Sequence, residues 1–338
     1  MTSDAMIATF EKQKKQAQLS VSLKKPYFET KVFEDFRARV FKVLLERDEL
    51  IRNGIREVQG AALIGPPGIG KTRMVEQISA DFRQLVAKTG GLEFGSNFWS
   101  VTIPSRATVK EICELILRQL GYPISPTSRR NPDYLIGLVR SRLKDRDVAA
   151  LHLDEVQDSG RYTTNNTMKQ ITSNFRNLMQ DDDWPVSLIV TGTMEAKAII
   201  NDNDTFLRRL EPIEVLPMEF SEEGVALKTA GKELLKKAGV LDDGLLDEDE
   251  FIRILMHASA QRFGIAIEIL ISAISSAGMS KPKTISFEHF AKSYYERMNC
   301  DDALNPFLSR DWRSIDTTIA MDRHIKESRQ TRRKPRQR

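Results

Sequence analysis

The chain has 338 residues, of which 41% are hydrophobic and 29% charged, with a net charge of +4. This composition excludes a disordered protein, a collagen and a disulfide-rich scaffold. Its two cysteines, Cys113 and Cys300, lie far apart and form no metal-binding or redox motif, which fits a reducing compartment. No apolar run is long enough to span a bilayer, and the N-terminus lacks the apolar segment of a signal peptide. We therefore expect a cytoplasmic protein that has no membrane partner.

The first part of the chain alternates short apolar strands with helices. Residues 1–29 form a polar extension, of which residues 1–26 are expected to be loosely ordered. An apolar helix face then repeats at four-residue spacing from Val32 to Leu44. Residues 30–219 predict an α/β domain with a parallel sheet and helices on both faces. The predicted strands are 60–64, 98–103, 148–153, 186–191 and 213–216.

The later part of the chain predicts helices and a basic tail. Strand patterns nearly vanish after Pro217, and residues 220–298 have the periodicity of a small all-helical lid domain. Residues 299–338 are expected to form a C-terminal tail. From Ser309 onwards ten Lys/Arg face four Asp/Glu, a net charge of +6, so the rest of the chain carries −2. Such a tail is either simply solvated or also contacts DNA or an acidic partner.

A glycine-rich segment follows the first predicted strand. Its sequence, GPPGIGKT, matches the phosphate-loop pattern G-x-x-x-x-G-K-[ST] and lies between a predicted strand and a predicted helix. Its glycines let backbone N–H groups surround phosphate oxygens, and the following helix N-terminus favours negative charge. We expect Lys71 to reach the β- and γ-phosphates of ATP and the Thr72 hydroxyl to bind Mg²⁺. The assigned nucleotide-binding residues are Gly65, Pro66, Pro67, Gly68, Ile69, Gly70, Lys71, Thr72 and Arg73.

The third predicted strand, 148–153, leads into two carboxylates. Asp154 is expected to hold Mg²⁺, and Glu155 to polarise the water that attacks the γ-phosphate. An Asp-Glu pair is usually solvated surface, but at the end of a buried strand it predicts the acidic half of an ATPase site. His152, in the middle of this strand, is expected to serve packing.

Two further features are compatible with a nucleotide site. Thr191 ends the strand 186–191, and it would point at the γ-phosphate if that strand neighbours the one ending at Asp154. Arg208 and Arg209 lie on a short helix before the last strand. An arginine that reaches a neighbouring subunit's γ-phosphate would stabilise the transition state. Arg209 is the first candidate and Arg208 the second, with surface salt bridges as the alternative for both.

These segments together resemble an AAA+ ATPase, a P-loop NTPase with a helical lid. More narrowly, the chain resembles the TniB/TnsC family, the AAA+ regulators of Tn7-like and Tn5053-like DNA transposition, over roughly residues 27–312. The narrower resemblance is carried by the segments YFET, VTIPSRATVKEICELILRQLGYP, LDEVQ and NPFL, with Trp312 soon after.

The resemblance implies an ATP-dependent homo-oligomer on double-stranded DNA. It would be a ring or a helical filament, with a hexamer per turn, that links a target-selector protein to the transposase on the bacterial nucleoid. Its cofactors would be ATP and Mg²⁺, and ATP hydrolysis would control disassembly.

The resemblance also suggests residues for DNA and for the lid. In relatives, DNA contacts come from the segment after the second strand, where this chain has Arg106 and Lys110; Lys169 and Arg176 form a weaker second candidate. Solvated surface charge is the alternative for Arg106 and Lys110. A lid arginine normally contacts the nucleotide, and Arg262 is the nearest match, about one helical turn before the usual position.

Two other functions are compatible with the same ATPase motifs. A replication initiator or helicase loader normally adds a winged-helix domain, for which residues 299–338 are too few and too charged. A STAND-type signalling ATPase normally carries long sensor repeats after its lid. We therefore expect the transposition regulator.

Overall fold

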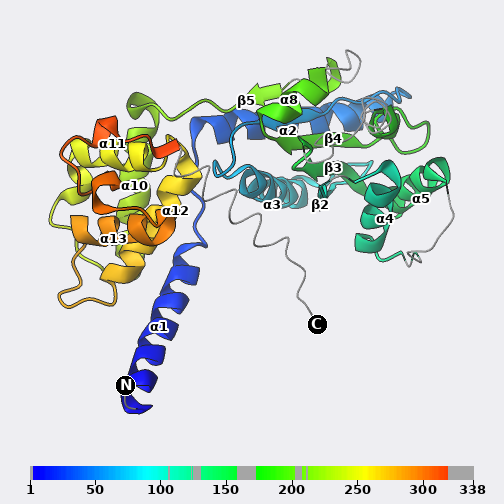
Figure 1. Cartoon of the computed structure of the whole chain (residues 1–338). Helices are drawn as coiled ribbons and strands as arrows, with labels where there is room; N and C mark the ends of the chain where they lie inside the picture. The colour runs from blue at the N-terminus through cyan, green and yellow to red at the C-terminus, as the bar shows by residue number, and fades with distance from the viewer. Residues whose placement is uncertain are drawn as a thin grey trace. The chain divides into compact units, whose positions relative to one another are not determined.

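The computed structural model describes residues 3–105, 107–122, 124, 131–157, 173–201, 208–210 and 212–318. The chain divides into two compact units. One is Lys31–Leu216, and the other combines Met1–Thr30 with Pro217–Arg338. Each unit has its own hydrophobic core, and Figure 1 shows that the first contains the strands while the second is helical.

The α/β unit is built around a five-stranded parallel sheet with the strand order β2-β3-β4-β1-β5. Every residue of the central strands β1, β3 and β4 is buried. Since successive side chains of a strand point to opposite faces, both faces of the sheet are covered. The predicted fold class is confirmed. The elements of this unit are α2 (Lys31–Arg52), β1 (Ala61–Ile64), α3 (Lys71–Thr89), β2 (Asn97–Thr102), α4 (Val109–Gln119), α5 (Pro132–Asp145), β3 (Val148–Asp154), β4 (Ser187–Gly192), α8 (Met194–Asn201) and β5 (Pro212–Glu214).

The strand order determines which residues meet at the edge of the sheet. β1 leads into the phosphate loop and pairs with β4, with Leu63 opposite Thr191. β4 also pairs with β3, with Val190 opposite Leu153. The carboxyl ends of parallel strands meet at one edge of a sheet, where α/β proteins bind ligands. The phosphate loop, Asp154 and Thr191 therefore come together at that edge.

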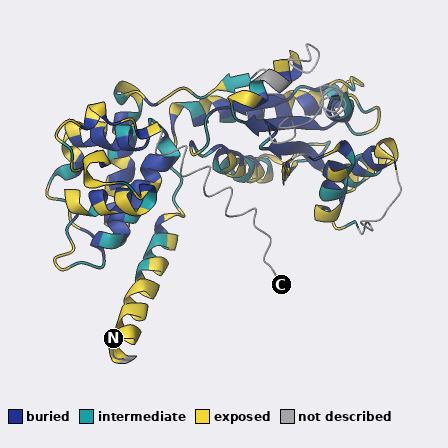
Figure 2. Cartoon of the chain, viewed as in Figure 1, coloured by how far each residue is buried: buried dark blue, intermediate teal, exposed yellow. Residues whose placement is uncertain are grey.

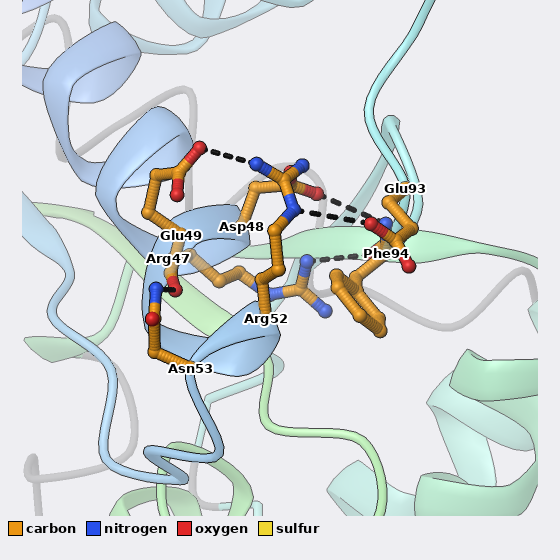
Figure 3. Close-up of polar contacts among 7 residues, drawn as sticks. All are labelled: Arg47, Asp48, Glu49, Arg52, Asn53, Glu93 and Phe94. Carbon is orange, nitrogen blue, oxygen red and sulfur yellow. Dashed lines mark hydrogen bonds and ion pairs between the residues drawn. The ribbon is translucent and has the colours of Figure 1, made fainter.

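Helix α2 is tied to two loops by a fully buried arginine. Arg47 donates from Nε to the carbonyl of Pro185 at 2.8 Å and from Nη1 to the carbonyl of Phe94 at 2.6 Å. The neighbouring Asp48 accepts from the backbone N–H of Phe94 at 2.9 Å and from Arg52 at 2.7 Å (Figure 3). Burial lowers the pKa of Arg47 to about 10, so the guanidinium remains charged at neutral pH.

The second unit is a helical bundle around an apolar core. The core includes Leu234, Phe251, Leu270 and Phe290, one from each of the four long helices. No single described helix is long and apolar enough to cross a membrane, although α11 and α12 meet that test as a pair bent by 110°. The helices of the bundle are α10 (Phe220–Ala238), α11 (Asp249–Ala258), α12 (Phe263–Ala277) and α13 (Phe287–Met298), with single 3₁₀ turns at Leu245–Asp247, Asp302–Leu304 and Trp312–Ser314.

The N-terminal extension is a helix, so the expectation of a loosely ordered segment is wrong. Helix α1 covers Ser3–Leu23. Leu23 is buried in the core of the bundle and Leu19 packs against that core, so closely that a Cβ at Gly278 would lie 2.7 Å from Leu19 Cδ2. The first half of α1 is exposed, as the yellow colour in Figure 2 shows. Helix α1 forms because its sequence is rich in Lys, Gln and Ala, which are good helix formers.

The expected boundary between lid and tail at residue 298 must also be corrected. Asn305 Nδ2 donates to the carbonyl of Ala291 at 2.8 Å, and Phe307 and Trp312 are buried in the core of the bundle. Thr317 Oγ1 donates to the carbonyl of His257 at 2.8 Å. The chain thus packs on the bundle through at least Thr317, and the strongly basic residues 319–338 lie outside the described residues.

Candidate nucleotide-binding site

The phosphate loop connects β1 directly to α3. Gly68 and Gly70 have φ of 86° and 93°, in the left-handed region that favours glycine. Gly65 has a different reason to be glycine, because a Cβ there would lie 2.6 Å from Ile69 Cδ1. Gly70 is the N-cap of α3, and no side chain caps this helix. The first-turn N–H groups of α3 are therefore suited to an anionic ligand.

Lys71 lies folded against the loop that it follows. Its Nζ donates to the carbonyl of Gly65 at 2.9 Å and to that of Pro66 at 3.1 Å, and the residue is 6% exposed. The ammonium group is therefore held by the loop that is expected to surround phosphates. The next residues of α3, Thr72 and Arg73, are exposed and half-buried respectively.

Asp154 connects the loop to the strand ends. Thr72 Oγ1 donates to Asp154 Oδ2 at 2.6 Å, and Thr191 Oγ1 donates to Asp154 Oδ1 at 2.5 Å. Among the described residues, no group of three or more His, Cys, Asp or Glu could hold a metal ion. A hydroxyl and a carboxylate nevertheless fit Mg²⁺, which usually takes one or two protein ligands and completes its shell with phosphates and water.

His152 belongs to the same hydrogen-bond network, although packing was expected for it. Its Nε2 lies 2.8 Å from Thr191 Oγ1 and its Nδ1 lies 3.1 Å from Ser100 Oγ. Because the single proton of Thr191 goes to Asp154, His152 must donate from Nε2 and accept at Nδ1. Burial lowers the pKa of His152 to about 4, so the ring is neutral at pH 7. The network therefore runs across β2, β3 and β4.

Glu155 follows Asp154 with an unusual backbone. Its φ is 58°, a conformation that costs of order 1 kcal/mol or more for a residue other than glycine. The backbone N–H of Glu155 donates to Asp154 Oδ1 at 3.0 Å, and that of Val156 donates to the carbonyl of Thr191 at 3.3 Å. The chain thus turns at Glu155 so that the next residue, Val156, bonds to the end of β4.

The two candidate arginines differ in exposure. Arg209 is 7% exposed and forms an ion pair with Glu57, with Nε 3.1 Å from Oε1. The hydrogen bond from Arg209 holds the pKa of Glu57 below its usual value. Arg208 is exposed. Because an arginine that serves a neighbouring subunit must reach out of its own, the structure favours Arg208 over the first candidate.

The described structure places three of the five residues expected to contact DNA or to act from the lid. Arg106 and Lys169 lie outside the described residues. Lys110 lies in the first turn of α4, 3.8 Å from Glu114, and Arg176 is half-buried among the described helical residues 173–178. Arg262 is 8% exposed at the N-cap of α12, in the helical unit. The roles of these residues stay predictions.

Residues 38–220 match the family model described as the bacterial TniB protein. The chain belongs to the TniB family. A search of curated proteins found no match. Among solved structures, this TniB-family chain is similar to the Aeropyrum pernix ORC1 protein in complex with DNA, at 17% identity and a TM-score of 0.55, covering 82% of this chain and 68% of that one.

Two other solved structures give the same result. The Aeropyrum pernix ORC2 protein, in ADPNP-ADP complexes, has 14% identity and a TM-score of 0.54, with 78% of this chain and 68% of that chain covered. Cdc6p from Pyrobaculum aerophilum has 18% identity and a TM-score of 0.52, with 81% and 70% covered. At such identities the likeness concerns the fold. Family and fold together show a TniB-family protein with the AAA+ fold.

Proposed function

We propose that this TniB-family protein hydrolyses ATP with Mg²⁺, assembles with ATP as a homo-oligomer on double-stranded DNA, and connects a target selector to a transposase. The observation that carries the ATPase part is the pair of hydroxyls, from Thr72 and Thr191, that both donate to Asp154 beside the phosphate loop. The transposition part rests on membership of the TniB family.

Lys71 must change partners when ATP binds. Its ammonium is held by two backbone carbonyls of the loop, at 2.9 and 3.1 Å. Phosphate oxygens carry full negative charge and form stronger, charge-assisted hydrogen bonds than carbonyls do. Nucleotide therefore draws Lys71 from Gly65 and Pro66 to the β- and γ-phosphates, while the first-turn N–H groups of α3 receive the other phosphate oxygens.

The side chains around Asp154 divide the chemistry between them. Bound Mg²⁺, held by Thr72 and Asp154, would neutralise charge between the β- and γ-phosphates. Glu155 orients the attacking water and accepts its proton. When ATP binds, the Thr191 hydroxyl turns its one proton from Asp154 to the γ-phosphate. Since Thr191 and Thr72 donate to opposite oxygens of one carboxylate, Asp154 keeps both hydroxyls beside the reacting group.

Assembly completes the site in this proposal. Arg208, exposed on the described surface, supplies positive charge to the γ-phosphate of a neighbouring subunit. Hydrolysis then depends on the contact between subunits, and loss of the γ-phosphate weakens that contact. This dependence explains how ATP turnover limits the lifetime of an oligomer.

Contact with DNA is proposed for the segment that follows β2. This segment leads into α4, where Thr108 and Glu111 form a capping box and Lys110 lies in the first turn. Contacts from such residues to DNA phosphates ignore sequence and weaken as salt rises. The alternative of a replication initiator is not favoured by the likeness to ORC and Cdc6 proteins, because that likeness concerns the fold.

The experiment that tests the proposal compares the parent with Glu155→Gln on labelled duplex DNA in ATP and Mg²⁺. General-base groups contribute about 10²-fold or more to rate. We therefore expect Glu155→Gln to bind ATP, to hydrolyse it about 10²-fold more slowly, and to stay on DNA correspondingly longer after dilution. Lys71→Ala is the control that forms no ATP-dependent assembly. Release of Glu155→Gln at the parent's rate would contradict the proposal.

A further inference from the structure

Gln157 is a buried amide that the mechanism above does not use. It lies two residues after Glu155 and is 1% exposed. Its Nε2 donates to Glu155 Oε2, and its Oε1 accepts from the backbone N–H of Thr193 at 3.0 Å. A buried amide is costly unless it is hydrogen-bonded, so both ends of this side chain are held.

The two hydrogen-bond partners of Gln157 are compatible with only one of the two orientations of its amide. The N–H of Thr193 can only donate, and the carboxylate of Glu155 accepts. A flipped amide would place oxygen against carboxylate and NH₂ against N–H, which loses both hydrogen bonds. Gln157 therefore presents its NH₂ group to Glu155.

Gln157 also rests tightly on the end of β4. A Cβ at position 192 would lie 2.8 Å from Gln157 Oε1, so a side chain at this position would collide with the amide. The carbonyl of Gly192 accepts from the N–H of Gly65 at 3.1 Å, which ties the same strand end to the phosphate loop. The amide is thus fixed to the backbone that carries Thr191.

We propose that Gln157 is the positioning residue for the Glu155 carboxylate. This inference rests on the role of Glu155 in the proposed function. A glutamate side chain on a left-handed backbone turn can take many directions, and only some of them point at the water beside the γ-phosphate. The Oε1 end of Gln157 is held by Thr193 and lies against Gly192, so its NH₂ group can restrict the directions of the Glu155 carboxylate. Because Gly192 also bonds to Gly65, the carboxylate is held at a fixed position relative to the phosphate loop.

Two variants separate the contacts of Gln157. Gln157→Met keeps the length of the side chain but neither donates to Glu155 nor accepts from Thr193. Gln157→Glu keeps the shape and can still accept from Thr193, but it places a second carboxylate against Glu155. If only the contact with Glu155 matters, both variants lower turnover. Gln157→Glu then loses as much turnover as Gln157→Met, although it keeps the hydrogen bond from Thr193.

The test measures single-turnover ATP hydrolysis, with duplex DNA present, for the parent, Gln157→Met, Gln157→Glu, Glu155→Gln and the double variants. We expect each Gln157 variant to lower the rate constant of hydrolysis about tenfold, with the KM for ATP and the affinity for a non-hydrolysable analogue unchanged. In the Glu155→Gln background neither change should have a further effect, because a residue that acts through Glu155 loses its influence with it.

Each of the following results would overturn the inference. A similar loss in both backgrounds would make Gln157 a structural residue, and an unchanged rate constant would remove any role in positioning. If Glu155→Gln itself hydrolysed ATP at the parent's rate, the proposed role of Glu155 would fall together with the inference. A slow Glu155→Gln beside a normal Gln157→Met would overturn the inference alone. Gln157→Glu keeps the test decisive if Gln157→Met does not fold.

Discussion

Thr191 Oγ1 lies 2.5 Å from Asp154 Oδ1, so the end of β4 is hydrogen-bonded to the end of β3 through their side chains. The strand 186–191 was expected to contribute to the site only if it neighbours the strand that ends at Asp154. The two strands pair in the sheet. The same threonine hydroxyl also accepts from His152, which fixes its direction from a second side.

This relationship predicts the effect of Thr191→Val. The change keeps the shape of the side chain and removes the hydroxyl that contacts Asp154 and, in our proposal, the γ-phosphate. We expect ATP turnover to fall by about 10²-fold, in line with the loss of one preorganised donor, with little change in the affinity for ATP.

Thr193→Val is the matched control for that change. Its hydroxyl is buried without a hydrogen-bond partner in the described structure, whereas its backbone N–H, which contacts Gln157, is unaffected by the substitution. Turnover should therefore be normal in Thr193→Val. If the two valine variants lost equal activity, the hydroxyl of Thr191 would have no special role.

Arg208 and Arg209 should differ in what they affect. Arg208→Ala should lower turnover in the assembled protein and leave ATP affinity of the isolated subunit unchanged. Arg209→Ala should instead lower the free energy of unfolding by about 1–2 kcal/mol, because it removes the ion pair with Glu57 and leaves that carboxylate without its cation.

Mixing two inactive variants tests whether Arg208 acts between subunits. Arg208→Ala subunits have an intact ATP site, and Glu155→Gln subunits have an intact Arg208. We expect a mixture to hydrolyse ATP faster than either variant does alone. If the rate of the mixture were only the average of the two, the arginine would act within its own subunit or not at all.

The buried contacts of Arg47 predict a large effect of its replacement on stability, although Arg47 has no role in the candidate nucleotide-binding site. Arg47→Met removes two hydrogen bonds from a guanidinium that is fully buried and leaves the carbonyls of Pro185 and Phe94 without these donors. The expected loss is about 3 kcal/mol in the free energy of unfolding, measured by urea denaturation followed by circular dichroism.

Lys42→Met is the control for Arg47, on the same helix α2. The Lys42 side chain is 66% exposed and its ion-pair partner Glu46 is 49% exposed, so this pair is solvated. Surface pairs contribute about 0–1 kcal/mol. Equal losses for the two variants would contradict the view that burial determines the contribution of Arg47.

The corrected boundary of the tail predicts which truncation is harmless. Deletion of 319–338 removes a net charge of +6 and should leave ATP hydrolysis and the melting temperature unchanged while weakening contact with DNA or a partner. Deletion of 309–338 also removes Trp312 and Thr317, which pack on the helical bundle, and should destabilise that unit by about 3 kcal/mol or more. Two truncations with the same melting temperature would show that residues 309–318 do not stabilise the bundle.

The sequence predicted the fold, and it located the candidate site residues at the ends of strands, for a physical reason. A phosphate loop requires glycines and a lysine at fixed spacing, and buried strands are continuous apolar runs. Strand ends therefore located Lys71, Asp154, Glu155 and Thr191. The residue pattern alone could not show that the strand ending at Thr191 neighbours the strand ending at Asp154. The strand order of the sheet shows that it does.

Contacts between distant side chains could not be predicted in this way. His152 bonds to Thr191, and Arg209 pairs with Glu57, a residue 152 positions away. Such partners depend on the register of neighbouring strands and on loop paths, neither of which has a local signal. A polar residue in the middle of an otherwise apolar strand, as at His152, was the one signal of a buried network.

The most direct test of the account is the fluorescence anisotropy of a labelled duplex of arbitrary sequence, titrated with protein with and without a non-hydrolysable ATP analogue. The account predicts binding that requires the analogue, that weakens steeply between about 50 and 200 mM salt, and that Lys71→Ala abolishes. Equal binding without nucleotide, or no binding in either state, would contradict ATP-driven assembly on DNA.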